Sequence, residues 1–160
     1  MGPGGERIAE HYAFDSFCKK ELIQNGIRLY GKDIRGQLPA PSAGDLPADI
    51  ARFCDTVKKH ARDTGRSLYT FGRMPDISRC LYTLRTGDIS SKTSAAERTM
   101  ENGLCPDPDD HAYSLMLRRK PARCKADPSV FDHAETLYGS ILRYADVPER
   151  ELGQHASGQE

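Results

Sequence analysis

The segment 26–31, GIRLYG, is the one stretch of this 160-residue chain that is typical of a β-strand. Ile27 and Leu29 alternate with Arg28 and Tyr30, which is the two-residue period of a strand. A lone strand cannot satisfy its backbone hydrogen-bonding groups and needs a neighbouring strand. No other segment predicts one, so we expect an all-α fold with one short strand whose partner lies outside this chain.

The other apolar residues recur at helical spacing and predict a bundle of five or six helices. The expected helices are 6–24, a second between Pro47 and Gly65, a third between Pro75 and Gly87, a fourth from about 91 to 100, a fifth around 112–116, and a sixth from 127 to about 146. Asp127 suits an N-cap and Pro128 a first helical position, while Ser94 and Glu97 have capping-box spacing.

The same patterns divide the chain into a disordered tail (1–5), one helical domain (6–147) and a flexible polar tail (148–160). Residues 32–47 carry three prolines and few large apolar side chains, so we expect a long Pro/Gly loop there. Loops of this length in small domains are uncommon, and they are often functional or packed on a partner.

Charge and hydropathy exclude some classes of protein. Lys and Arg number 23, as do Asp and Glu, which argues against a nucleic-acid binder that works by bulk positive charge. No apolar run approaches the ~20 residues that span a bilayer, and no signal peptide is visible, so we expect a cytoplasmic protein and no membrane partner. The five cysteines are odd in number and widely spaced, which favours reduced and mostly buried thiols. The scattered histidines predict solvated or capping roles.

The most informative chemistry lies in 77–98. Arg79 sits within an otherwise apolar helix face, and Lys92 follows 13 residues later at the start of the next helix. A helix start presents free N–H groups and a partial positive charge, so the two cations could converge on one phosphate group. The alternative is that Arg79 pairs with Asp76 or Asp88 while Lys92 stays in solvent.

The segment RCLYTLRTGDISSKTSAAE, together with GIRLYG and LPAPSAGDLP, resembles the C-terminal helical domain of the aminoglycoside nucleotidyltransferases, in particular the streptomycin/spectinomycin adenylyltransferases. The resemblance covers roughly 14–147. It implies that Arg79 and Lys92 contact the phosphates of ATP. Possible auxiliary contacts are Asp76, Tyr82, Arg118, Arg119 and Lys120.

The same resemblance implies that a catalytic N-terminal domain is missing. Members of the family hold Mg²⁺ on an Asp-x-Asp pair after a Gly-Ser turn, and this chain has no such pair on a strand. We expect the nearest acids, Asp107, Asp109 and Asp110, to be loop and cap residues, and we predict neither a catalytic residue nor a metal ligand here. ATP and Mg²⁺ are therefore implied cofactors, the catalytic domain is an implied partner in cis or in trans that 26–47 would pack against, and the acceptor would be a small-molecule hydroxyl.

Two further alternatives stay open. The chain could be a stand-alone helical module that works in trans with a separate nucleotidyltransferase or has a pure interaction role. Arg150 and His155 match the Arg-x4-His spacing of HEPN-type ribonucleases, which are also small helical bundles, but we expect them to lie in the polar tail.

Overall fold

The computed structural model describes residues 15–62, 67–120 and 127–157. Within these ranges the chain is all-α, with seven α-helices, one short 3₁₀ helix and no strand. The elements are α1 (Ser16–Asn25), η1 (Arg35–Gln37), α2 (Asp45–His60), α3 (Leu68–Thr86), α4 (Lys92–Glu101), α5 (Pro108–Arg119), α6 (Pro128–Thr136) and α7 (Tyr138–Ser157). The expected helical bundle is confirmed.

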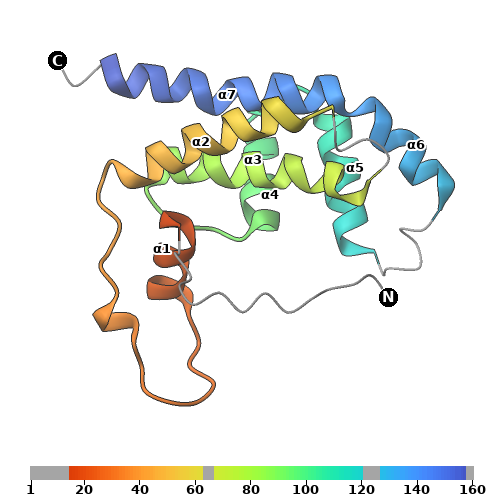
Figure 1. The fold of residues 1–160 in the computed structure, drawn as a ribbon. Coiled ribbons are helices and arrows are strands. Elements are labelled where there is room, and N and C mark those ends of the chain that lie inside the picture. The colour runs from red at the N-terminus through yellow and green to blue at the C-terminus, as the bar shows by residue number, and fades with distance from the viewer. Residues whose placement is uncertain (1–14, 63–66, 121–126, 158–160) are drawn as a thin grey trace.

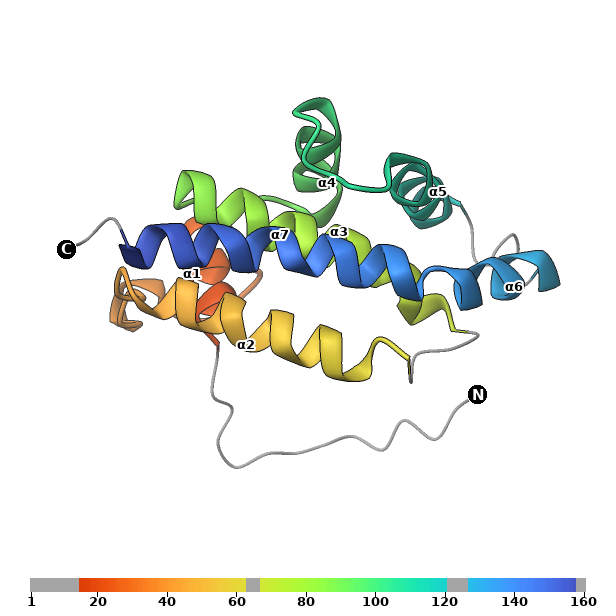
Figure 2. The ribbon, with the colours of Figure 1, turned by 90° about the horizontal axis from the view of Figure 1, so that it is seen from above.

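Three long helices form the body of the bundle. Helices α2, α3 and α7 lie nearly side by side, and α2 runs opposite to the other two (Figure 1). Seen from above, α4 and α5 lie on the α3 side and cross the long helices steeply (Figure 2). Helix α1 lies below one end of α2 and α3, while α6 extends beyond the other end (Figure 1).

The core lies where the apolar stripes of the long helices meet. Val57 from α2, Ile77 and Leu81 from α3, and Ile141 and Tyr144 from α7 are at most 1% exposed. Each stripe repeats at three or four residues, which places its members on one face of a helix. A smaller cluster of Ile50, Cys54 and Cys80 lies beside this core.

Several predicted helix ends are confirmed. Asp127 caps α6 by accepting a hydrogen bond from the Ser129 N–H at 2.9 Å, and Pro128 is the first helical residue. Gly87 ends α3 with a φ of 72°, a left-handed conformation that costs glycine little. The cap of α4 is Ser91, whose Oγ accepts from the Ser94 N–H, so the capping box expected at Ser94 is wrong.

Two prolines lie inside helices where breaks were expected. Helix α3 begins at Leu68 and passes through Pro75, and α7 passes through Pro148 and ends at Ser157. Both rings are less than 2% exposed, so their packing offsets the lost hydrogen bond, about 3 kcal/mol in an exposed helix. The expectation that the last helix ends near 146 and leads into a flexible tail is therefore wrong for 148–157.

Ion pairs hold this extension of α7 in place. Lys58 of α2 pairs with Asp146 at 2.5 Å and also with Glu149, and Arg85 of α3 pairs with Glu151.

The single helix expected over 127–146 is in fact two helices, α6 and α7, which meet at the fully buried Leu137.

The strand predicted at 26–31 is wrong. The segment is irregular, and no described residue pairs with its backbone as a neighbouring strand. Instead, the Arg35 guanidinium donates to the Gly26 carbonyl at 2.8 Å and closes 26–35 into a loop, which we call the arm. At its tip Ile27, Leu29 and Tyr30 are 85–94% exposed.

The N-terminal expectations are tested only in part. The helix expected over 6–24 is present from Ser16 to Asn25, and it ends at the predicted Asn25-Gly26 stop. Residues 6–14 and the tail expected at 1–5 lie outside the described residues. No described helix is long and apolar enough to cross a membrane.

Candidate functional site

Arg79 lies on α3 with its guanidinium largely buried. Its side chain is 15% exposed, and Nη2 donates to the Glu21 carboxylate of α1 at 2.7 Å. The guanidinium also lies 5.5 Å from the centre of the Phe17 ring. Its Nε–H is buried and has no hydrogen-bond partner within the described residues. Buried donors usually have a hydrogen-bond acceptor, so the Arg79 Nε–H lacks an acceptor that the described residues do not supply.

Lys92 is the first residue of α4, as the sequence predicts, and its Nζ lies 2.5 Å from an oxygen of Asp76 on α3. The alternative to a phosphate site, in which Arg79 pairs with Asp76 or Asp88 and Lys92 stays in solvent, is not observed. Arg79 pairs with Glu21, and Lys92 pairs with Asp76. Both carboxylates retain contact with solvent, with 48% of Glu21 and 24% of Asp76 exposed.

Arg79 and Lys92 both affect the ionisation of Cys80 on α3. Burial raises the pKa of the Cys80 thiol, and Arg79 and Lys92 both oppose that shift while Asp76 adds to it. All three charged side chains therefore lie within electrostatic reach of the same sulfur atom on α3. Lys92 pairs with Asp76, which lies three residues before Arg79 and therefore on the same side of α3. We call this surface, which carries Arg79 and Lys92 between α3 and the start of α4, the cationic region.

The auxiliary residues divide into two groups. Arg118 belongs beside the cationic region because its Nε donates to Thr93, next to Lys92, at 3.2 Å. Arg119 pairs instead with Glu97, and Tyr82 lies against Arg98, whose Nη1 donates to the tyrosine hydroxyl at 3.3 Å. Lys120 is exposed just after α5 and makes no ion pair with a described residue.

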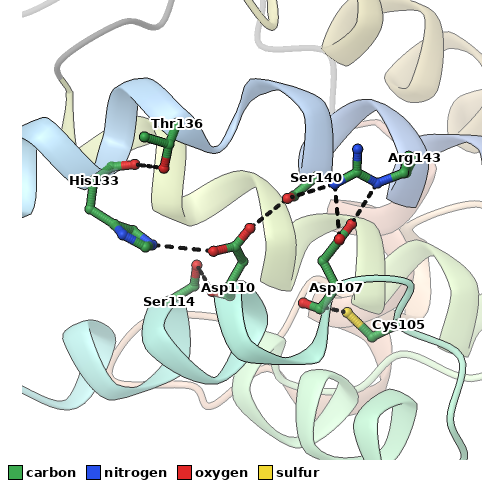
Figure 3. A network of polar contacts seen from close by, with 8 residues as sticks. All are labelled: Cys105, Asp107, Asp110, Ser114, His133, Thr136, Ser140 and Arg143. Atoms are coloured by element: carbon green, nitrogen blue, oxygen red, sulfur yellow. Dashed lines mark hydrogen bonds and ion pairs between the residues drawn. The ribbon is translucent and has the colours of Figure 1, made fainter.

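Two of the acids near the start of α5 accept hydrogen bonds from side chains of α7. Arg143 of α7 donates to both oxygens of Asp107 at 2.9 Å, and the Ser140 hydroxyl donates to Asp110 at 2.5 Å (Figure 3). Asp109 is exposed in the first turn of α5. Within 15–62, 67–120 and 127–157 no three His, Cys, Asp or Glu side chains gather to hold a metal ion. The described residues therefore do not fit the Mg²⁺ that the resemblance implies.

Ser140, Asp110 and His133 do not form a nucleophile with its base. The His133 Nε2 lies 3.3 Å from the Asp110 carboxylate, and the serine donates to that same carboxylate (Figure 3). Nucleophilic catalysis requires the serine to contact the histidine. The His133 ring stacks with Phe71 instead, with ring centroids 6.0 Å apart, and so contributes to packing.

A buried polar network joins four helices and was missed from the sequence. The Ser78 hydroxyl lies 3.2 Å from the His111 Nε2 and 2.9 Å from the Tyr144 hydroxyl, which donates to Thr99 at 3.0 Å. His111 is 0% exposed, so a solvated or capping role is wrong for it. Its spacing on α5 carries no signal of this, because burial depends on how α3, α4 and α7 pack around it.

The cysteines and the Arg-x4-His pair do not form a reactive site among the described residues. Cys54, Cys80 and Cys105 are buried, all are free thiols, and Cys124 lies outside the described residues. Burial raises the pKa of Cys105 to about 11, so it is not a ready nucleophile. Arg150 lies on α7 rather than in a tail, is exposed, and donates to its own helix at Asp146. The His155 side chain lies outside the described residues.

No protein-family model matches the chain, and no curated protein or solved structure matches it either. The likeness to aminoglycoside nucleotidyltransferases therefore rests on the motif residues alone and stays a prediction.

Proposed function

We propose that this chain is a non-catalytic, polyphosphate-binding helical domain of an aminoglycoside-nucleotidyltransferase-like enzyme. The observation that carries the proposal is the cationic region, where Lys92 pairs with Asp76, three residues before Arg79 on α3, and the buried Arg79 Nε–H has no partner within the described residues. A separate domain, in cis or in trans, would supply the metal ligands and the catalytic residues.

The pairing of the two cations with carboxylates is compatible with phosphate binding. Glu21 and Asp76 neutralise Arg79 and Lys92 in the free protein, and a phosphate oxygen can take over the same donors with charge-assisted hydrogen bonds. Displacing Glu21 costs little because half of its side chain already faces water. Arg118, held near Lys92 through Thr93, adds a third positive charge at the edge of the region.

The contribution of this domain would be positioning and charge stabilisation. Bound ATP would supply the nucleotidyl group for transfer to a hydroxyl of a small molecule. Arg79 and Lys92 would hold the triphosphate in one orientation and neutralise part of its charge, which are effects that a helical half can provide without reacting itself. Because no described cluster fits Mg²⁺, we assign no step of the reaction to a metal in this chain.

The test is calorimetric titration of the chain with sodium tripolyphosphate and with ATP at low salt. We expect Arg79→Gln and Lys92→Gln each to weaken binding about tenfold, the usual effect of losing one charge-assisted contact. Glu21→Gln should strengthen it, because Arg79 loses its competing carboxylate. Arg85→Gln, which removes a cation that pairs with Glu151 in the last turn of the same helix, is the control and should leave the affinity for tripolyphosphate unchanged.

A purely structural role for these residues gives a different pattern. If the Arg79 and Lys92 variants bind tripolyphosphate like the parent, or if Glu21→Gln weakens binding as they do, the phosphate assignment fails. Circular dichroism and thermal unfolding of each variant keep loss of folding separate from loss of binding.

The arm supports a second candidate function, a helical interaction module. Four of the seven large apolar residues that the described structure exposes lie within 27–34. We expect the natural protein to migrate as a complex when purified under native conditions from its own cells, and Leu29→Asp with Tyr30→Asp to release a monomer of 17.8 kDa. Tyr69→Asp, a change at a tyrosine that is 81% exposed on α3, is the control. A monomer in all three preparations would contradict this candidate.

A further inference from the structure

A pocket of about 610 Å³ lies where α1, α2, α3 and α7 meet. Its size is within the range of pockets that hold small organic ligands, ~300–1,000 Å³. The walls are mainly apolar, and the side chains that form them include Leu46, Pro47, Ile50, Leu84 and Leu152. The residues that line it include neither Arg79, Lys92 nor Arg118, so an inference about this pocket does not rest on the proposed function.

One charged side chain, Lys20 of α1, is present among the described residues that line the pocket. Its ammonium donates to the Gly87 carbonyl at the end of α3 and makes no ion pair with a described carboxylate. An ammonium has three donors, so a single neutral acceptor leaves two donors and the charge for solvent or for a ligand. Lys58 and Lys92 are different, since each of them pairs with an acid.

An apolar pocket with one unmatched positive charge selects an amphipathic anion. We propose that this pocket binds a small monocarboxylate with a hydrocarbon body, whose carboxylate pairs with Lys20 and whose chain lies against Leu84 and Leu152. Burial of the hydrocarbon contributes about 25 cal/mol per Å² of apolar surface, and the ion pair sets the orientation.

The charge at the edge of the pocket favours a monoanion over a phosphate monoester. Lys20 can neutralise one negative charge, and the second charge of a phosphate monoester would have no partner. A neutral alcohol of the same length would fill the apolar walls but leave Lys20 unmatched.

The experiment compares decanoate, decanol and decyl phosphate by calorimetric titration of the full chain. We expect decanoate to bind about tenfold more tightly than either of the other probes. Lys20→Gln should remove that tenfold advantage while leaving the affinity for decanol within twofold. Lys19→Gln, a neighbouring lysine of α1 that does not line the pocket, is the matched control and should behave like the parent.

A second variant tests the location independently of charge. Ala43 lines the pocket from the loop before α2, so Ala43→Phe should fill it and weaken binding of decanoate and decanol alike. Equal affinity for decanol and decanoate, tighter binding of decyl phosphate, equal effects of the two lysine variants, or no measurable binding of decanoate would each overturn the proposal.

Discussion

Helices α7 and α1 are attached to the bundle by different forces. Helix α7 places Ile141, Tyr144 and Ala145 in the core with no exposed surface, whereas α1 has no buried residue. What holds α1 is mainly polar: the Ser16 N–H donates to Asp49 at 2.7 Å, Glu21 pairs with Arg79, and Lys20 contacts Gly87. Stability in this protein is thus unevenly distributed, and α1 together with the arm belongs to its least protected part.

The difference matters because both candidate sites include residues of α1. Glu21 pairs with Arg79 of the cationic region, and the preceding residue, Lys20, lies at the apolar pocket. An element held by exchangeable polar contacts can give them up to a ligand, while an element held by apolar burial cannot do so without unfolding.

The largest expected effect comes from removing core packing on α7. Ile141→Ala should lower the free energy of unfolding by about 2–5 kcal/mol, because it deletes fully buried methyl groups and leaves a cavity. Phe17→Ala on α1 is the matched change and should cost about 1 kcal/mol, since this ring is half-buried against the smaller cluster. Urea unfolding of both variants measures the comparison, and equal losses would mean that α1 is as firmly held as α7.

Acid should destabilise the core that α7 shares with His111 of α5. Burial lowers the pKa of His111 to about 4 from 6.5, so as the pH falls the unfolded chain takes up the proton first. The contribution to stability is complete above about pH 6.5 and is lost as the pH falls towards 4, by up to about 1.4 kcal/mol per pH unit. Urea unfolding from pH 7 to 4.5 measures this slope.

The control for the acid effect is His111→Gln, which removes the titrating group from the network with Ser78 and Tyr144. The variant will be less stable, but its stability should vary less with pH between 6.5 and 4.5. An unchanged slope would show that groups other than His111 govern the acid response.

The smallest expected effect is that of salt on α1. Raising the ionic strength from 0.1 to 1 M shortens the Debye length from ~10 to ~3 Å and weakens the Glu21–Arg79 pair. Amide hydrogen exchange should therefore quicken a few-fold in α1 and stay unchanged in α7. In Glu21→Gln the salt effect on α1 should disappear, and equal acceleration in both helices would contradict the polar attachment of α1.

Sequence patterns predicted the parts of the fold that local chemistry determines. The apolar periodicity located the helices, and Asn25-Gly26, Gly87 and the Asp127-Pro128 pair marked ends that the structure confirms. The prolines misled because Pro75 and Pro148 are stabilised in their helices by tertiary burial, which no local pattern carries.

The candidate site was less predictable than the fold. The spacing of Arg79 and Lys92 located two neighbouring cations, but not their partners. Glu21 lies 58 residues from Arg79 in the sequence, and it reaches the guanidinium only because α1 packs across the end of α3. The alternation in the arm predicted a strand, and that prediction is wrong because a strand forms only beside another and no described segment provides one.

The bond from Arg35 to the Gly26 carbonyl has a consequence for any protein that meets the arm. By closing 26–35 at its base, and with Asp33 bonded to the same guanidinium at 2.9 Å, it restricts the conformations that the exposed tip can adopt in the free chain. Less conformational entropy is then lost on association, so a small apolar tip can contribute more to affinity than an unrestrained peptide of the same sequence.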